Sequence, residues 1–115
     1  MGADVSDIAL IPSVSSAAGL VAAQLGRARQ GDNVVIGQRE YSSNHFPWRQ
    51  LVDKGYDVRQ VPFHNGGLEP EDVGERINPS TKLVAFSGVQ SATGHRSDIC
   101  RNQPPRSKRR GDCVR

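Results

Sequence analysis

Short β-branched segments alternate with helix-forming segments along most of this chain. Val34, Val35 and Ile36 form an apolar, β-branched run typical of a buried strand, and they follow a turn signal at 31–33. An Ala- and Leu-rich stretch at 17–28 follows a cluster of serines, whose hydroxyls are suited to cap a helix. Such alternation is typical of right-handed βαβ units. The pattern therefore predicts an α/β fold with a mostly parallel sheet.

The same signals place the other expected elements. Pro47 suits a first helical position, and Gly55 closes the helical segment that follows. Acidic residues at 69–72 suit the N-terminus of another helix. We expect strands at 7–11, 34–36, 56–63 and 82–89, and helices at 17–28, 47–54 and 70–77.

Charge and cysteine content divide the chain into two regions. Residues 1–99 carry 9 Lys+Arg against 11 Asp+Glu and no cysteine, whereas residues 100–115 carry 6 basic residues, 1 acidic residue and both cysteines. The 115 residues suffice for one small domain. The first region therefore has no disulfide framework, and we expect a reducing, cytoplasmic setting. No apolar run approaches the roughly 20 residues that span a bilayer, and the chain begins with acidic residues, so neither membrane insertion nor secretion is predicted.

Three polar segments follow expected strands and are candidate ligand sites. The first is the serine cluster at 13–16, where the free amides of a helix start suit a phosphate group, although plain helix capping is the simpler explanation of the serines. The second, 40–48, combines an aromatic ring, small polar residues and a histidine. The third is 87–96. Parallel sheets bring such segments to one edge, so a single ligand can contact all three.

Other candidate chemistry is weak. Residues 106–110 have the composition of a nucleic-acid patch, but no aromatic residues are interleaved, and a solvated charge run is the simpler interpretation. His95, Cys100 and Cys113 lack the paired spacing of a zinc site, so we predict no metal. His45 has no neighbouring nucleophile, and Trp48 is expected to anchor its helix by packing.

Three blocks in this order resemble the class V aminotransferases, which are pyridoxal-phosphate enzymes of fold type I related to cysteine desulfurases and selenocysteine lyases. The blocks are Ile-Ala-Leu-Ile-Pro-Ser-Val-Ser-Ser-Ala at 8–17, Gly-Asp-Asn-Val-Val with the segment ending in Pro-Trp at 31–48, and Leu-Val-Ala-Phe-Ser-Gly-Val-Gln-Ser-Ala-Thr-Gly-His-Arg at 83–96. The resemblance implies that residues 1–99 are part of a large domain of this fold type. It also implies pyridoxal phosphate as cofactor, an amino acid as substrate and a homodimer as the full-length form.

The resemblance also implies cofactor-binding positions. The turn at Val14, Ser15 and Ser16 is similar to the family's phosphate-binding turn. Ser42 stands where desulfurase-like members place a histidine that stacks on the cofactor ring; serine cannot stack, and the neighbouring Tyr41 offers a ring instead. Ser91 matches a polar residue near the cofactor's phenolic oxygen, and Gln90 competes for that role. The predicted cofactor-binding residues are Val14, Ser15, Ser16, Tyr41, Ser42, Gln90 and Ser91.

Two residues central to the family's chemistry are not found. Lys54, Lys82 and Lys108 do not match the lysine that forms the Schiff base, and no aspartate matches the partner of the pyridine nitrogen. We therefore predict no catalytic residue here and an incomplete protein that is inactive alone. The Arg-, Pro- and Cys-rich tail at 100–115 is expected to be disordered and resembles a shifted reading frame. The alternative is a non-catalytic remnant, or a small binding module whose basic tail contacts nucleic acid.

Overall fold

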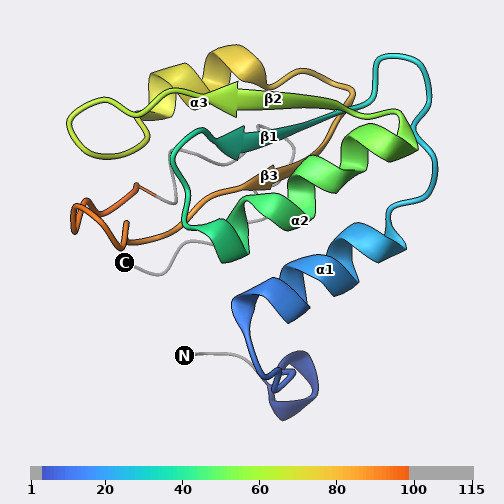
Figure 1. Ribbon diagram of the computed structural model, residues 1–115, viewed down its shortest axis with the longest axis horizontal. Coiled ribbons are helices and arrows are strands. Elements are labelled where there is room, and N and C mark those ends of the chain that lie inside the picture. Colours follow the sequence, from blue (N-terminus) through green and yellow to red (C-terminus); the bar gives the residue numbers. More distant parts are fainter. Residues whose placement is uncertain (1–3, 99–115) are drawn as a thin grey trace.

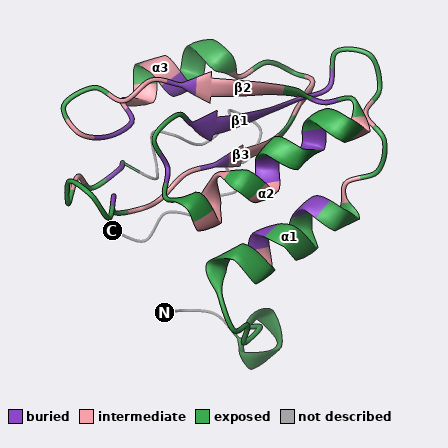
Figure 2. Ribbon diagram, in the orientation of Figure 1, coloured by how far each residue is buried: buried purple, intermediate pink, exposed green. Residues whose placement is uncertain are grey.

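The computed structural model describes residues 4–98 and shows a three-stranded, all-parallel sheet. The strands are β1 (Asn33–Gly37), β2 (Asp57–Val61) and β3 (Thr81–Ala85), and their spatial order is β2-β1-β3. β1 lies in the middle and is buried along its whole length (Figure 2). The expected α/β class with a parallel sheet is therefore confirmed, and it is consistent with the fragment of a fold type I domain that the resemblance implies.

Helices cover both faces of this sheet (Figure 1). α1 (Val14–Gln24) and α2 (Phe46–Arg49), which continues as the 3₁₀ helix η3 (Gln50–Lys54), lie on one face, and α3 (Pro70–Arg76) lies on the other. Two short 3₁₀ turns, η1 (Val5–Asp7) and η2 (Ser42–Asn44), complete the elements. No helix among residues 4–98 is both long enough and apolar enough to cross a membrane.

The alternation of side chains along β1 divides the core into two halves. Val34 and Ile36 pack with Trp48 and Leu51 beneath α1 and α2, whereas Val35 packs on the α3 side. Trp48 is 6% exposed, which confirms its expected packing role. Because β1 is buried on both faces, its sequence is continuously apolar from 34 to 36.

At the amino end of the strands, polar groups are fully paired although they are buried. The Asn33 side chain accepts a 2.7 Å hydrogen bond from the Thr81 hydroxyl and donates one of 2.9 Å to Asn78. The Asp32 carboxylate accepts the Arg29 amide at 3.0 Å and lies 3.2 Å from the Lys82 ammonium. The Arg29 amide, and then Lys82, hold the pKa of Asp32 below its usual range.

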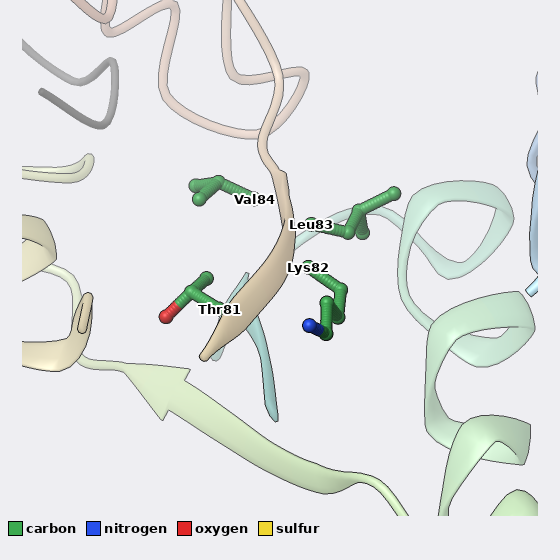
Figure 3. Close-up of a pocket in the computed structure, with 4 residues that line it drawn as sticks. All are labelled: Thr81, Lys82, Leu83 and Val84. Atoms are coloured by element: carbon green, nitrogen blue, oxygen red, sulfur yellow. The ribbon is translucent and has the colours of Figure 1, made fainter. Parts of the chain in front are cut away.

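β3 is an edge strand with an irregular register. Asn33 pairs with Thr81 but Val34 pairs with Leu83, so one extra residue is inserted between these pairs. Lys82 and Leu83 consequently lie on one side of β3, with Thr81 and Val84 on the other (Figure 3). These four residues line an open hollow of about 220 Å³ beside the strand.

The strand expected at 7–11 is wrong. Val5–Asp7 form the 3₁₀ turn η1, and residues 8–12 have no strand pairing within the described part of the chain. Leu10 is 96% exposed. An apolar segment forms a strand only where it can pair with the edge of a sheet and pack against a core. In the described structure, neither lies beside residues 8–12.

Other element boundaries also differ from expectation. The first helix begins at Val14 because Ser13 caps it, and it ends at Gln24 instead of residue 28. β2 ends at Val61 because Pro62 has no amide hydrogen for the sheet. β3 ends at Ala85, and residues 86–89 belong to a loop. The expectations for 100–115, including the nucleic-acid patch at 106–110, lie outside the described residues.

Candidate functional site

The carboxyl ends of the strands lead into polar loops at one end of the sheet (Figure 1). We call these loops (38–45 after β1, 62–69 after β2 and 86–97 after β3), together with the start of α1 at 13–16, the loop rim. α1 contacts both η2 and α2, and in Figure 1 the starts of α1 and α2 lie at the same end. The serine turn therefore belongs to the rim through helix packing, not through a preceding strand as the sequence predicted.

The serine turn combines a helix cap with exposed hydroxyls. The Ser13 side chain accepts the Ser16 amide at 3.1 Å, which confirms capping for this serine. Its hydroxyl also lies 3.1 Å from that of Ser15 and 2.9 Å from that of Ser16. Val14, Ser15 and Ser16 are exposed. First-turn amides have no intrahelical acceptor and lie at the positive end of the helix dipole, so this donor set suits a phosphate group.

The loop after β1 offers an exposed aromatic ring. Tyr41 is 62% exposed and immediately precedes η2. Ser42 is also exposed, and its carbonyl accepts the amide of His45. The His45 ring lies edge-on to Phe46, with 5.7 Å between the ring centroids. Tyr41 has the ring and the exposure that stacking on a flat ligand requires, and Phe46, which is 63% exposed, has them as well.

The loop after β3 separates its two predicted site residues. Ser91 is exposed, whereas Gln90 is 3% exposed and donates its side-chain amide to Glu40 at 2.9 Å. The loop turns tightly at Gly94, which has φ of +71° and donates its amide to the Gln90 carbonyl at 2.8 Å. Ser91 is thus the open position of the pair, because the Gln90 amide is already engaged.

Glu40 lies at the carboxyl end of the sheet and was not among the site residues predicted from the sequence. It is 7% exposed, and both carboxylate oxygens accept hydrogen bonds. Its role could have been predicted from its position close after a buried strand, because an acidic side chain there lies between the loops that follow neighbouring strands. The donors are the Asn44 side chain at 3.1 Å, the Ser87 amide at 2.9 Å, the Ser87 hydroxyl and the Gln90 side chain at 2.9 Å.

The loop after β2 supports the other side of the loop after β3. Asn65 and Gly66 both have positive φ, at 50° and 89°, and form a tight turn closed by two hydrogen bonds between His64 and Gly67. The Thr93 hydroxyl donates to the Gly66 carbonyl at 2.6 Å. The loop at 86–97 is therefore held from both neighbouring loops.

The structure brings no metal-binding cluster together in the part of the chain that it describes. His95 lies against Gly67, where an added Cβ would come within 1.9 Å of the ring. The cysteines that the sequence considered beside it, Cys100 and Cys113, lie outside the described residues.

Comparisons with known proteins match most of the chain. The family model described as Aminotransferase class-V matches residues 1–102. A probable cysteine desulfurase of Methanothermobacter thermautotrophicus is 33% identical over 100 residues, covering 86% of this chain and 25% of that protein. One of Halalkalibacterium halodurans is 35% identical over 92 residues, covering 76% and 23%. A cysteine desulfurase of Salmonella newport is 34% identical over 68 residues, covering 57% and 17%. The chain thus spans about a quarter or less of the length of these relatives.

Proposed function

Since the chain belongs to the class V aminotransferase family, we propose that its loop rim is part of a pyridoxal-phosphate site in an enzyme that acts on an amino acid. Enzymes of this family are generally pyridoxal-phosphate-dependent. The observation that carries the proposal for this chain is the meeting of the serine turn and the loops after β1 and β3 at one end of the sheet. That end is where open parallel sheets bind ligands.

The residues present fit the chemistry of this cofactor. The amides of Val14 and Ser15, with the Ser15 and Ser16 hydroxyls, offer donors for its phosphate. The exposed Tyr41 ring offers a face for the pyridine ring, and the Ser91 hydroxyl offers a polar contact. Ser42 is exposed beside Tyr41 but cannot stack. Gln90 stabilises the rim from inside the protein, because its side-chain amide is hydrogen-bonded to Glu40.

Bound pyridoxal phosphate supplies an electron sink that stabilises negative charge on an amino acid's α-carbon. The part of this task that the described residues perform is binding and orientation. The serine turn anchors the phosphate, and Tyr41 and Ser91 limit how the ring lies. We propose no proton transfer within this chain.

Both described lysines are engaged away from the loop rim. The Lys54 ammonium donates to carbonyls at the end of α1, and Lys82 pairs with Asp32 at the amino end of the sheet. Neither is therefore placed to form a covalent bond to a cofactor held at the rim. This supports the proposal that the chain is an incomplete enzyme, inactive by itself. We also propose that it works in the cytoplasm, as the absence of cysteine from residues 1–99 favours.

The relatives' names guide the choice of reaction. They favour cysteine as the amino acid and removal of its sulfur as the chemistry, with transamination as the alternative for the complete enzyme. Lyase and epimerase reactions remain within the same class of chemistry. A homodimer of the full-length form is part of the proposal.

The test uses pyridoxine 5′-phosphate, an alcohol that keeps the ring and phosphate but cannot react with lysines. Trp48 is the chain's one tryptophan and lies near the rim, bonded to Asn44, so its emission reports binding. We expect saturable quenching that Ser15→Ala weakens and that inorganic phosphate competes away. Unchanged emission at all ligand concentrations would refute the proposal.

The non-catalytic alternative has its own measurement. A chain whose basic tail contacts nucleic acid binds an oligonucleotide with an affinity that falls steeply as salt rises. We expect no such binding at physiological salt. Tight, salt-sensitive oligonucleotide binding together with unchanged Trp48 emission would favour a nucleic-acid module.

A further inference from the structure

A buried carboxylate joins the two loops that carry the proposed ring contacts. Glu40 follows β1, and its side chain receives donors from η2 and from the loop after β3, up to 50 residues away in sequence. We propose that Glu40 is a positioning residue, which sets Tyr41 and Ser91 in the places where they meet the cofactor. This inference rests on the proposed function.

The free-energy cost of burying the Glu40 carboxylate favours one position of the loop after β3. Burying an ionised carboxylate is costly unless hydrogen bonds replace its water. Four donors do so here, and three of them, the two from Ser87 and that of Gln90, belong to the loop after β3. If that loop moved, the charge would stay buried with most of its partners lost. The observed loop position is therefore favoured over displaced ones.

The partners of Glu40 are direct neighbours of the proposed contact residues. Tyr41 follows Glu40 in the chain, and Ser91 follows Gln90. Asn44 links the carboxylate to Trp48, whose indole donates to the side-chain Oδ1 of Asn44 at 3.0 Å. Displacing the carboxylate thus disturbs both sides of the ring site at once.

Space for the carboxylate depends on a glycine. An added Cβ at Gly37 would lie 2.9 Å from Cγ and Oε1 of Glu40 and equally close to Cε1 of Phe63. Gly37→Ala therefore displaces the Glu40 side chain without removing it, and it also presses on the Phe63 ring. This change provides a second, independent variant.

Glu40→Gln tests the same link more gently. Its amide oxygen must replace Oε1, because the Ser87 backbone amide donates there and cannot reverse. The new NH₂ group then faces the Asn44 NH₂, which cannot flip without losing its bond from Trp48. We expect this variant to keep the bond to the loop after β3 and to lose the one to η2.

The experiment compares these variants in the 115-residue chain with Asp32→Asn, which alters a buried carboxylate at the opposite end of the sheet. Affinity for pyridoxine 5′-phosphate is read from Trp48 emission, stability from urea unfolding, and loop order from hydrogen exchange of peptides covering 86–98. We expect Glu40→Ala and Gly37→Ala to weaken binding about tenfold and to speed loop exchange, because the loops that carry Tyr41 and Ser91 lose their shared anchor. Glu40→Gln should lie between them and the wild type.

The outcomes separate the two proposals. Asp32→Asn should destabilise the fold yet keep the affinity within about twofold, because distant sites act independently. If Glu40→Ala folds and binds as tightly as the wild type, or if Asp32→Asn weakens binding as much at equal loss of stability, the positioning role is overturned and the proposed function survives. If the wild type itself does not bind, the proposed function fails, and the positioning role fails with it.

Discussion

The Lys54 ammonium donates a 2.6 Å hydrogen bond to the carbonyl oxygen of Leu25, the C-cap residue that follows α1. It also reaches the carbonyls of Ala22 at 2.9 Å and Ala23 at 3.2 Å. The last carbonyls of a helix lack intrahelical donors and carry the negative end of its dipole. One cation at the end of η3 therefore closes α1 and fastens it to the neighbouring helix.

Replacing this cation should loosen the helical layer. Lys54→Met keeps the length of the side chain but removes its donors, and we expect a loss of about 1–2 kcal/mol in the free energy of unfolding. Urea unfolding followed by circular dichroism measures it. Arg49→Met, at an exposed position of α2, is the matched control and should change stability by less than about 0.5 kcal/mol. Equal effects of the two variants would contradict the capping role.

The serine turn should separate stability from binding. Ser13→Ala removes the cap of α1 and should cost about 1 kcal/mol of stability. Ser15→Ala removes an exposed hydroxyl and should leave stability within about 0.5 kcal/mol while weakening pyridoxine 5′-phosphate binding. Urea unfolding and Trp48 quenching on both variants test this. A Ser15→Ala chain with unchanged affinity would remove that hydroxyl from the phosphate site.

Asp32 should make stability depend on pH in the acid range. Its folded-state pKa lies below the ordinary value of 3.8, so the stabilisation is complete above that value and is lost as pH falls through the folded-state pKa. We expect Asp32→Asn to be less stable than the wild type at neutral pH, with the difference shrinking in acid. Urea midpoints from about pH 7 down to about pH 2 measure it. A difference that stays constant over this range would contradict the assignment.

The exposed apolar residues near the N-terminus should drive association of the isolated chain. Leu10 is 96% exposed and Leu20 is 60% exposed, and Val5, Ile8, Ile11 and Val14 are exposed in the same region. We expect light scattering to rise with protein concentration and to fall in the double variant Leu10→Lys, Leu20→Lys, with unchanged circular dichroism. A wild-type chain that stays monomeric at high concentration with a cooperative melt would contradict this prediction.

Two glycines should respond to alanine in opposite directions. Gly66 has φ of +89°, and an added Cβ would lie 3.2 Å from the Cβ of Thr93. Gly66→Ala should cost about 1 kcal/mol or more and speed hydrogen exchange in 86–98. Gly74, inside α3, has nothing within 4 Å of such a Cβ, so Gly74→Ala should stabilise by up to about 1 kcal/mol. Thermal melts of both variants provide the comparison.

The described site was only partly predictable from local sequence. Ser13 follows the rules of helix capping, so a cap in the serine cluster was predicted from residue type alone. Gln90 was expected to face the cofactor, but its side chain is bonded to Glu40, 50 residues away. That pairing depends on β1 and β3 lying side by side, which no local pattern encodes.

The sequence by itself determined the parallel α/β class and the approximate places of β1, β2, β3 and the helices, because apolar periodicity and caps act within a few residues of each other. The tertiary structure decided that 7–11 forms no strand, that Lys54 closes α1, and that Glu40 joins the loops of the rim. Each of these depends on partners distant in sequence. A strand needs a neighbour to pair with, and a buried charge needs donors that only the folded chain brings to it.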